Sequence, residues 1–320
     1  MEQINLDEFG IIKDNTNSSI LFIPYENILG NIIDFHKKVR CKIIYSHYSK
    51  ELVGGYGIIN FGKRIEKDSI VECTIKRSID ISFNVLNEAI IQHKSYNILK
   101  DYNLEYMISK VFDIYKKNDN IYFSMLTIKG DYLHAFLVKS SNSEKDFIYC
   151  FLQISLALYI LEKHIILEHR DLRFANIFVV KEPKHIQFTL DDTLYSFHSN
   201  FHICILDFGF ACLGTKPPEL YASEELFNKN ERCFKPGRDI FQLLISLLSL
   251  ESIKKKFNNI FYNKLASLLQ NDKNDYRNLL SSKKKADLSY IATNYEDFSF
   301  NTLSPENFIK ILFDLLNYIT

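Results

Sequence analysis

The arrangement of apolar and polar positions along the chain changes near Gly130. Before this residue, short runs rich in β-branched and aromatic residues often alternate with polar ones, which predicts strands. These runs lie at 40–48, 56–62, 69–77, 108–116 and 120–128. A stretch at 83–99 carries apolar residues on or near one helical face, so it predicts a helix among the strands.

The second part of the chain has a helical pattern. The stretch 143–164 is apolar over much of its surface and ends in Lys and His, which suit a helix C-terminus. The stretch 238–250 is nearly all apolar and predicts a central buried helix. A further helix is predicted at 304–319, where Ser304 suits the N-cap and Pro305 the first helical position.

Together the two patterns predict an α+β fold with two lobes. Residues 36–128 are expected to form a β-rich lobe with one helix, and residues 129–320 a larger helical lobe. Residues 1–35 have no strong period and are interpreted as an N-terminal extension. Because no repeat and no low-complexity linker separates these parts, we expect one bilobal domain.

Composition narrows the class of protein. The 320 residues are 47% hydrophobic and 14% aromatic, enough for a large core, so disorder is not expected. Lys+Arg and Asp+Glu both number 39, and this balance argues against direct nucleic-acid binding, which needs a basic excess. It leaves open a local acidic groove for a basic peptide.

The cysteines and the apolar segments indicate a soluble, intracellular chain. None of the cysteines forms a CxxC pair, and their spacing fits neither a zinc site nor a disulfide framework, so we expect buried thiols in a reducing compartment. The cysteines are Cys41, Cys73, Cys150, Cys204, Cys212 and Cys233. The acidic start MEQINLDEFG does not suit a signal peptide. The most apolar windows, at 151–161 and 240–250, are interpreted as too short to span a membrane.

The stretch 167–179, LEHRDLRFANIFV, interrupts the apolar pattern with polar residues at fixed spacing. His-Arg-Asp at 169–171 is followed after four residues by Asn176, which gives the form H-R-D-x-x-x-x-N. A second motif, Asp-Phe-Gly at 207–209, comes just after an apolar strand. A simple ion-pair cluster would explain the first motif but neither the second nor their order.

These motifs resemble the catalytic segments of protein kinases, and the resemblance extends over about residues 50 to 250. It implies that Asp171 accepts the proton of a substrate hydroxyl and orients that hydroxyl toward the γ-phosphate of ATP. Asn176 and Asp207 supply hard oxygen donors suited to Mg²⁺. Arg173 would place a fixed positive charge near the transferred phosphoryl group. ATP and Mg²⁺ are therefore the expected cofactors.

Upstream residues extend the resemblance. Lys76 ends a predicted strand, where kinases hold the α- and β-phosphates, and Glu88 on the predicted helix would pair with it. Alone, these would be one Lys among many and one surface Glu. The glycines Gly54, Gly55 and Gly57 suggest a phosphate-binding loop, although Leu52 stands where the first glycine of the motif belongs. A plain glycine-rich hairpin turn is the alternative.

Three further parts are implied by the resemblance. Met125 would face the back of the adenine pocket, and Leu126 would begin the hinge that offers backbone groups to adenine; ordinary core packing of Met125 is the alternative. Asp239 would bond the backbone of the catalytic loop, unless it is only a helix-start Asp favoured by the macrodipole. His169 and Arg170 are expected to support the loop; in regulated kinases such an Arg pairs with a phosphorylated residue.

Two departures from ordinary kinases narrow the resemblance. Asn176 and Asp207 lie 31 positions apart, and the insert between them predicts an extended hairpin with Asp191-Asp192 at or near its turn. No A-P-E motif follows the Asp-Phe-Gly motif; the nearest fragment is Pro-Glu at 218–219. Both departures resemble the haspin kinases.

The haspin resemblance rests on quoted segments. LEHRDLRFANIFV is similar to the haspin pattern F-E-H-R-D-L-H-W-G-N-V-L, and YASEELF with RDIFQLL resembles the segment that replaces the activation loop. Haspins usually carry D-Y-T at 207–209 and His at the position of Arg173, so the chain departs there without losing a catalytic group.

This resemblance implies a monomeric serine/threonine kinase of the nucleus that acts on a threonine near the start of the histone H3 tail during mitosis. A basic tail needs acidic residues in the groove, and candidates lie in the family-specific segments, although each alone is most simply a solvated loop carboxylate. The candidates are Asp191, Asp192, Glu219, Glu224 and Glu225.

Other functions stay open at this stage. A pseudokinase scaffold would be expected to lack one of Lys76, Asp171, Asn176 or Asp207. A tyrosine kinase fits the Arg in HRDLRFAN but not the missing A-P-E segment. A small-molecule phosphotransferase would more often show H-G-D, so Arg170 argues against it.

Overall fold

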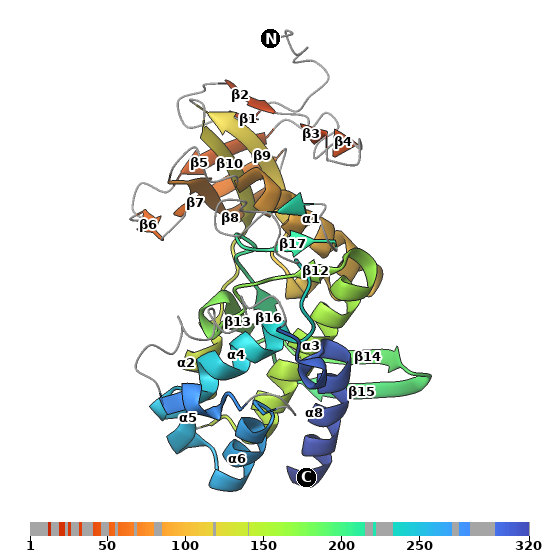
Figure 1. Cartoon of the computed structure of the whole chain (residues 1–320). Helices are drawn as coiled ribbons and strands as arrows, with labels where there is room; N and C mark the ends of the chain where they lie inside the picture. The colour runs from red at the N-terminus through yellow and green to blue at the C-terminus, as the bar shows by residue number, and fades with distance from the viewer. Residues whose placement is uncertain are drawn as a thin grey trace.

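A computed structural model gives the arrangement of most of the chain (Figure 1). It describes residues 12–13, 19–22, 25–26, 32–33, 41–45, 51–54, 57–66, 69–79, 85–117, 120–139, 141–214, 220–221, 233–270, 275–281 and 298–319. The strands of the larger sheet gather at the N-terminal end of the molecule and most helices at the other end, as the bilobal α+β kinase fold predicts.

The small lobe is built on one sheet in the order β5-β1-β2-β9-β10-β8-β7-β6. Strand β5 also pairs with β7, so the seven strands from β5 to β7 in this order form a closed ring. The strands are β1 Ile12–Lys13, β2 Ser19–Phe22, β5 Cys41–Tyr45, β6 Leu52–Val53, β7 Gly57–Glu66, β8 Ser69–Ser78, β9 Val111–Lys117 and β10 Asn120–Leu126. Each predicted run contains or overlaps one of these strands. A separate pair, β3 Tyr25–Glu26 and β4 Ile32–Ile33, lies outside this sheet.

Strands from the predicted N-terminal extension join the same sheet. β1 pairs with β2 and β5, and β2 pairs with β9. Residues before position 35 therefore contribute to the sheet of the small lobe.

Helix α1, Val85–Asp101, is the predicted helix of the small lobe. Its apolar residues Ala89, Ile90 and Ile91 are fully buried. The polar residues Glu88 and Gln92 are also buried on this helix, so one turn of α1 carries polar groups into the interior. A 3-10 turn, η1 Glu105–Met107, follows the helix and leads to β9.

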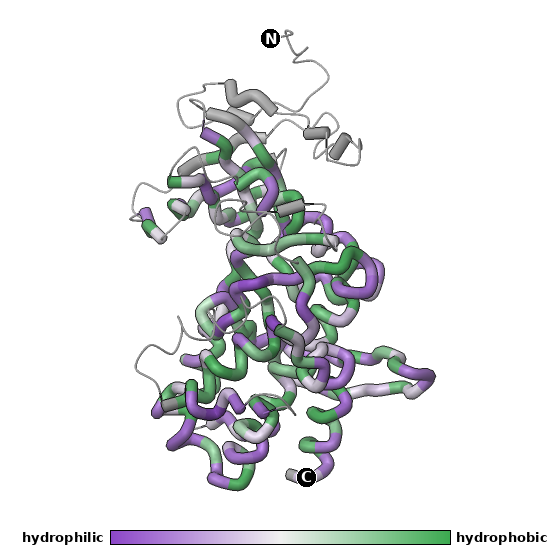
Figure 2. Tube along the Cα trace, viewed as in Figure 1, coloured by the Kyte–Doolittle hydropathy of each residue, from purple (hydrophilic) through white to green (hydrophobic). Residues whose placement is uncertain are grey.

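The large lobe is helical around one core. Helix α3, Glu144–Ile165, begins with a capping box between Ser143 and Asp146, and α8, Pro305–Ile319, packs against it. Helix α4, Arg238–Leu248, is buried along almost its whole length, as predicted for a central helix. Shorter helices complete the lobe: α2 Leu133–Leu137, α5 Glu251–Lys256, α6 Asn259–Ser267 and the 3-10 turns η3 Arg277–Ser281 and η4 Asn301–Leu303. Figure 2 shows apolar residues along the inner helices of this lobe.

Helix α3 has nearly the extent predicted from 143–164, but its apolar part is longer than the window at 151–161. It spans 22 residues, and by length and hydropathy alone it is a candidate membrane span. However, 67% of the 18-residue apolar window within α3 is buried inside the lobe. A core helix of a globular domain has this degree of burial.

Three small sheets organise the catalytic segments. β11 Asp131–Tyr132, β13 Ile177–Val180 and β16 His202–Ile205 form one, and β12 Leu167–Glu168, β17 Cys212–Leu213 and β18 Leu220–Tyr221 form another. The predicted hairpin insert is confirmed as β14 Lys184–Leu190 and β15 Thr193–Ser199, and both Asp191 and Asp192 have positive φ at its turn. This hairpin projects from the large lobe (Figure 1).

The prediction that the cysteines are all free thiols is wrong for two of them. Cys212 and Cys233 form a disulfide, with their Cα atoms 6.0 Å apart. Sequence spacing missed it because the chain between them leaves β17 and returns just before α4, and no local pattern predicts that path. Cys73, Cys150 and Cys204 are buried free thiols, and the side chain of Cys41 lies outside the described residues.

Candidate active site

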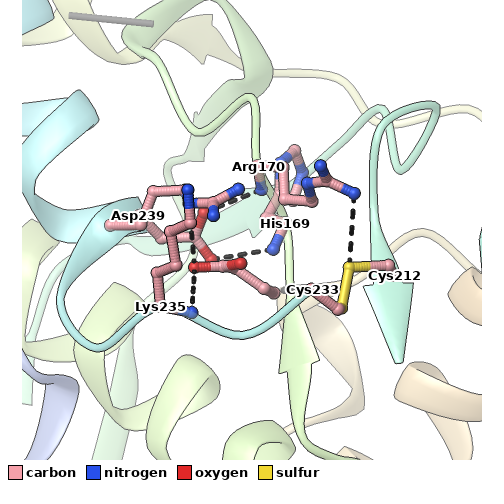
Figure 3. Close-up of a disulfide and its surroundings, with 8 residues drawn as sticks. His169, Arg170, Cys212, Cys233, Lys235 and Asp239 are labelled. Atoms are coloured by element: carbon pink, nitrogen blue, oxygen red, sulfur yellow. Dashed lines mark hydrogen bonds and ion pairs between the residues drawn. A yellow bond between two sulfur atoms is a disulfide. The ribbon is translucent and has the colours of Figure 1, made fainter. Parts of the chain in front are cut away.

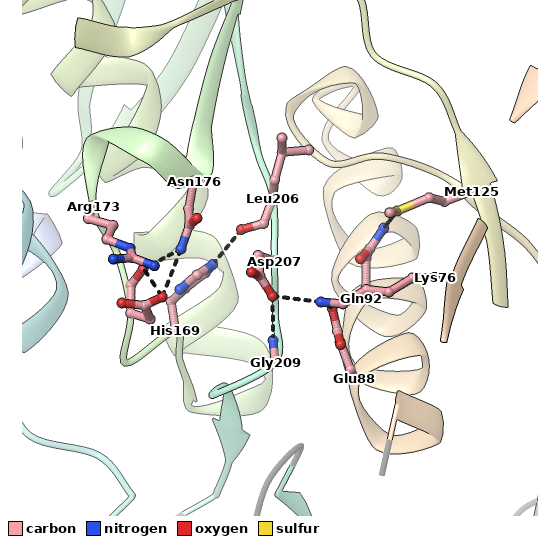
Figure 4. Close-up of polar contacts among 11 residues, drawn as sticks. Lys76, Glu88, Gln92, Met125, His169, Arg173, Asn176, Leu206, Asp207 and Gly209 are labelled. Carbon is pink, nitrogen blue, oxygen red and sulfur yellow. Dashed lines mark hydrogen bonds and ion pairs between the residues drawn. The ribbon is translucent and has the colours of Figure 1, made fainter. Parts of the chain in front are cut away.

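Lys76, Glu88 and Asp207 meet between the lobes. The Lys76 Nζ donates to Glu88 Oε1 at 2.6 Å and to Asp207 Oδ1 at 2.8 Å (Figure 4). Lys76 comes from β8 and Glu88 from α1, whereas Asp207 follows β16 of the large lobe. Lys76 and Glu88, which the kinase resemblance pairs, are thus in contact. Asp207, which the resemblance makes a metal ligand, joins them in one cluster that connects both lobes.

Local sequence explains how the cluster forms. In β8, residues 73–76 are all buried, so Lys76 enters the interior at the strand's inner end. Two glycines make room: a Cβ on Gly57 would lie 2.9 Å from Lys76 Cε, and one on Gly209 would lie 3.1 Å from Asp207 Oδ1. Asp207 itself has a φ of +61°, an uncommon conformation for a residue other than glycine.

Burial and charge set the protonation of this cluster. Burial alone would lower the pKa of Lys76, but the carboxylates of Asp207 and Glu88 outweigh it and raise that pKa. Burial raises the pKa of Glu88 above its usual value, against the opposing effect of Lys76. For Asp207, partial burial would raise the pKa, but the Lys76 ammonium lowers it below its usual value. Lys76 stays cationic and Asp207 anionic at neutral pH, as phosphate and metal binding require.

The catalytic loop places Asp171 beside Asn176 and Arg173. Asn176 Nδ2 donates to the Asp171 backbone carbonyl at 2.8 Å and to Asp171 Oδ2 at 3.0 Å. Arg173 Nε lies 3.4 Å from the same Oδ2. Burial raises the pKa of Asp171, while Arg173 lowers it. The carboxylate is therefore held in place by two neighbours and is a better base than an exposed aspartate.

Asp239 holds the backbone of this loop through hydrogen bonds. Its two carboxylate oxygens accept from the backbone N–H groups of His169 and Arg170, both at 2.8 Å. His169 Nε2 lies 3.0 Å from the carbonyl oxygen of Leu206, and its ring contacts Phe208. His169 thus connects the catalytic loop to the Asp-Phe-Gly motif.

Arg170 is enclosed. Only 1% of it is exposed, its backbone has a positive φ of 66°, and its Nη1 donates to Cys212 Sγ at 3.5 Å. The sequence left the partner of this side chain open; the structure places the disulfide sulfur beside it.

The predicted glycine loop and hinge are described in part. Gly54 donates from its backbone N–H to the carbonyl of Gly57 at 2.9 Å, which closes a tight turn; Gly55 lies outside the described residues. Met125 is partly buried, and its sulfur accepts a hydrogen bond from Gln92 Nε2 at 3.4 Å. The backbone N–H of Leu126 donates to the Lys110 carbonyl, and the Leu126 carbonyl accepts from the Ser109 hydroxyl. Both backbone groups of Leu126 therefore already have a hydrogen-bond partner within the protein.

Sequence reasoning missed residues that act only through contacts. Gln92 donates to the Ser109 carbonyl at 2.7 Å as well as to Met125, so it fixes the back of the expected adenine pocket. Glu168 accepts from the Lys235 N–H at 3.1 Å and pairs with Arg238 Nε at 3.3 Å under the catalytic loop. Glu168 stood in the quoted motif, but its neighbours lie about 70 positions away and no local signal identified them.

Two of the acidic candidates for peptide binding, Asp191 and Asp192, lie within the described residues, next to each other at the hairpin turn. Asp191 pairs with Lys310 of α8 at 2.5 Å, so its charge is compensated at the hairpin turn. Asp192 is exposed at the same turn. Glu219, Glu224 and Glu225 lie outside the described residues.

The donor set fits a divalent metal held together with phosphates. Both bonds from Asn176 use Nδ2, which leaves its Oδ1 for a cation, and the Asp207 side chain is 45% exposed. Within the described residues there is no group of three or more His, Cys, Asp or Glu able to hold a metal alone. Mg²⁺ is commonly bound by one or two protein oxygens plus substrate phosphates, and these two side chains suit that mode.

Comparisons with known proteins agree with this geometry. The family model described as the protein kinase domain matches residues 54–318, well over half of the chain. The chain therefore belongs to the protein kinase family, whose members use ATP and a divalent metal.

One solved structure with likeness to the chain is described as the crystal structure of the PF14_0431 kinase domain. It is 19% identical, with a TM-score of 0.37 over 51% of this chain and 50% of that one, so the chain spans about half the length of that structure. No curated protein matches the chain.

Proposed function

We propose that the chain transfers the γ-phosphate of Mg²⁺-ATP to a serine or threonine hydroxyl of a protein, as a haspin-like kinase. The observation that carries this proposal is the joint placement of Lys76, Glu88 and Asp207 on one side, and of Asp171 and Asn176 on the other. A pseudokinase scaffold has no need of such a complete set.

Each residue has a defined task in this reaction. Lys76 orients the α- and β-phosphates, and Glu88 keeps its ammonium in position. Asn176 and Asp207 would hold Mg²⁺, which supplies charge neutralisation on the phosphates. Asp171 accepts the hydroxyl proton as the oxygen attacks the γ-phosphorus, and Arg173 provides positive charge beside it.

The proposed substrate is a threonine near the N-terminus of the histone H3 tail. Support comes from the long hairpin insert before the Asp-Phe-Gly motif and from the absence of an A-P-E segment, both of which resemble haspins. The same resemblance supports a nuclear location on mitotic chromosomes, which imaging of the tagged chain in dividing cells would test.

The deciding experiment measures phosphate transfer from Mg²⁺-ATP to an unmodified H3 tail peptide, to the same peptide with its threonines replaced by alanine, and to a tyrosine-containing peptide. Asp171→Asn serves as the control variant. Transfer to the threonine peptide only, lost in Asp171→Asn, is expected. Transfer to other proteins but not to this peptide would overturn the histone assignment. Nucleotide binding with no transfer to any protein would establish a pseudokinase instead.

A further inference from the structure

The disulfide closes a loop at a sensitive place. Cys212 lies in β17, five residues after Asp207, and Cys233 lies just before α4, 21 positions further along the chain than Cys212. Figure 3 shows the bond beside His169, Arg170 and Asp239. The bond therefore joins the two ends of the segment that corresponds to an activation segment.

The bond also completes the enclosure of the catalytic loop. Within the sheet, Cys212 pairs with Glu168, directly before the His-Arg-Asp motif, and on its other side with Tyr221. On the Cys233 side, the backbone of Lys235 donates to Glu168, and Asp239 receives the loop's N–H groups. Both ends of the closed segment thus contact the residues that carry Asp171.

Arg170 has no open face for a phosphate. It is 1% exposed and donates to the sulfur of Cys212, whereas a phosphorylated residue would need an accessible guanidinium. Where a regulated kinase would hold this segment by charge, the chain holds it by a covalent bond.

We propose that Cys212 and Cys233 form a redox-controlled clasp that holds two stretches, 210–214 after the Asp-Phe-Gly motif and 233–237 before α4, against the catalytic loop. Its effect on catalysis rests on the proposed function; its effect on the segment does not. With the bond formed, these two stretches are tied to each other, and with two thiols each of them separates from the catalytic loop more often because the cross-link is gone.

The chemistry is thiol–disulfide exchange with a dithiol. One thiolate of the dithiol attacks a cysteine sulfur, the S–S bond breaks, and the other cysteine leaves as a thiolate that takes up a proton. The second thiol of the dithiol then attacks the mixed disulfide. Two electrons and two protons pass to the protein, which gains two thiols while the dithiol becomes a disulfide. Because both cysteines are fully buried, exchange requires local opening.

The test compares the full chain before and after treatment with dithiothreitol, with Cys212→Ala/Cys233→Ala as the variant and Cys150→Ala as the matched control. Cys150 is also fully buried but lies on α3 as a free thiol. Alkylation in denaturant, read by mass, reports whether two additional thiols appear on reduction. Hydrogen exchange of peptides covering 167–170 and 210–214 reports opening of the segment.

We expect two additional thiols on reduction and about tenfold faster exchange in these peptides. The double variant should exchange at the reduced rate whether or not dithiothreitol is present, and Cys150→Ala should behave as the unaltered chain. Catalytic efficiency toward the protein substrate should fall severalfold on reduction, while the KM for ATP changes by less than about twofold, because Lys76 and Asp207 lie outside the closed loop.

The clasp is overturned if oxidised and reduced chains label equally, if exchange is the same in both, or if the double variant keeps the redox response. A chain that transfers no phosphate in either state refutes the proposed function, while the exchange result still decides the clasp. Since the reduced chain carries no substitution, a double variant that folds poorly does not prevent the decision.

Discussion

Two clusters of charged residues in this chain use buried charge in different ways. The interlobe cluster of Lys76, Glu88 and Asp207 joins both lobes, and the Asp207 side chain stays 45% exposed. The support cluster of Glu168, Arg238 and Asp239 belongs to the large lobe alone, and each of its members is at most 4% exposed. The interlobe cluster has a partly exposed carboxylate available for a ligand. The support cluster uses its charges to hold the backbone of the catalytic loop and the side chains next to it.

This difference predicts separable effects of substitution. Changes at Asp171 or Asp207 should reduce activity with little effect on stability, because both side chains are partly exposed. Changes in the support cluster should reduce stability first, because removal of one partner leaves buried polar groups without compensation.

The largest expected effect is on catalysis at Asp171. Asp171→Asn keeps the size of the side chain but removes the base, so kcat should fall about 10³-fold, equivalent to about 4 kcal/mol of activation free energy. The free energy of unfolding should change by less than about 0.5 kcal/mol. Steady-state kinetics and urea denaturation measure the two quantities. A large stability loss with the same rate loss would contradict the expectation that the partly exposed reacting groups contribute little to stability.

The next effect is on stability at Asp239. Asp239→Ala leaves the N–H groups of His169 and Arg170 without their carboxylate, so the free energy of unfolding should fall by about 3 kcal/mol. Asp314→Ala, at an exposed position of α8, is the control and should change it by less than about 0.5 kcal/mol. Equal urea midpoints for the two variants would contradict a supporting role for Asp239.

The pH dependence of the reaction tests the surroundings of Asp171. Burial raises the pKa of this carboxyl and Arg173 opposes that rise, and only the ionised form acts as the base. Activity should therefore fall as pH drops, by about tenfold per unit below that pKa. Arg173→Gln removes the opposing charge and should move the acid limb of the kcat/KM profile to higher pH, whereas Arg173→Lys should leave it in place. An unmoved limb in Arg173→Gln would exclude Asp171 as its source.

The smallest effect is expected at the hairpin. Lys310 pairs with Asp191 and Glu306, but all three side chains are substantially exposed. Lys310→Ala should leave the urea midpoint close to that of the unaltered chain, and closer still at high salt, because exposed ion pairs are weak and screened. Urea midpoints at two ionic strengths check this. A loss as large as that of Asp239→Ala would mean that exposed and buried charges do not differ in this chain as proposed.

Much of the fold followed from local pattern. The strand runs, the α1 stretch and the hairpin with Asp191-Asp192 at its turn were predicted because periodicity and turn chemistry act over a few residues. The closed ring made by β5 and β7 and the entry of β1 and β2 into the sheet were not predicted, because such pairing joins distant segments of the chain.

By itself, the sequence determined which residue types stand at which spacing: the His-Arg-Asp and Asp-Phe-Gly motifs, the candidate Lys76 and the helix that carries Glu88. Phosphoryl transfer needs those groups whatever the path of the chain. The Lys76–Glu88 pair was expected, but only the tertiary structure decided the other partners of the charged residues. Lys76 meets Asp207 across 131 positions, Arg170 is enclosed beside a disulfide, and Leu126 is already bonded within the protein. These contacts depend on how the lobes and segments pack, and local pattern carries no information about that packing.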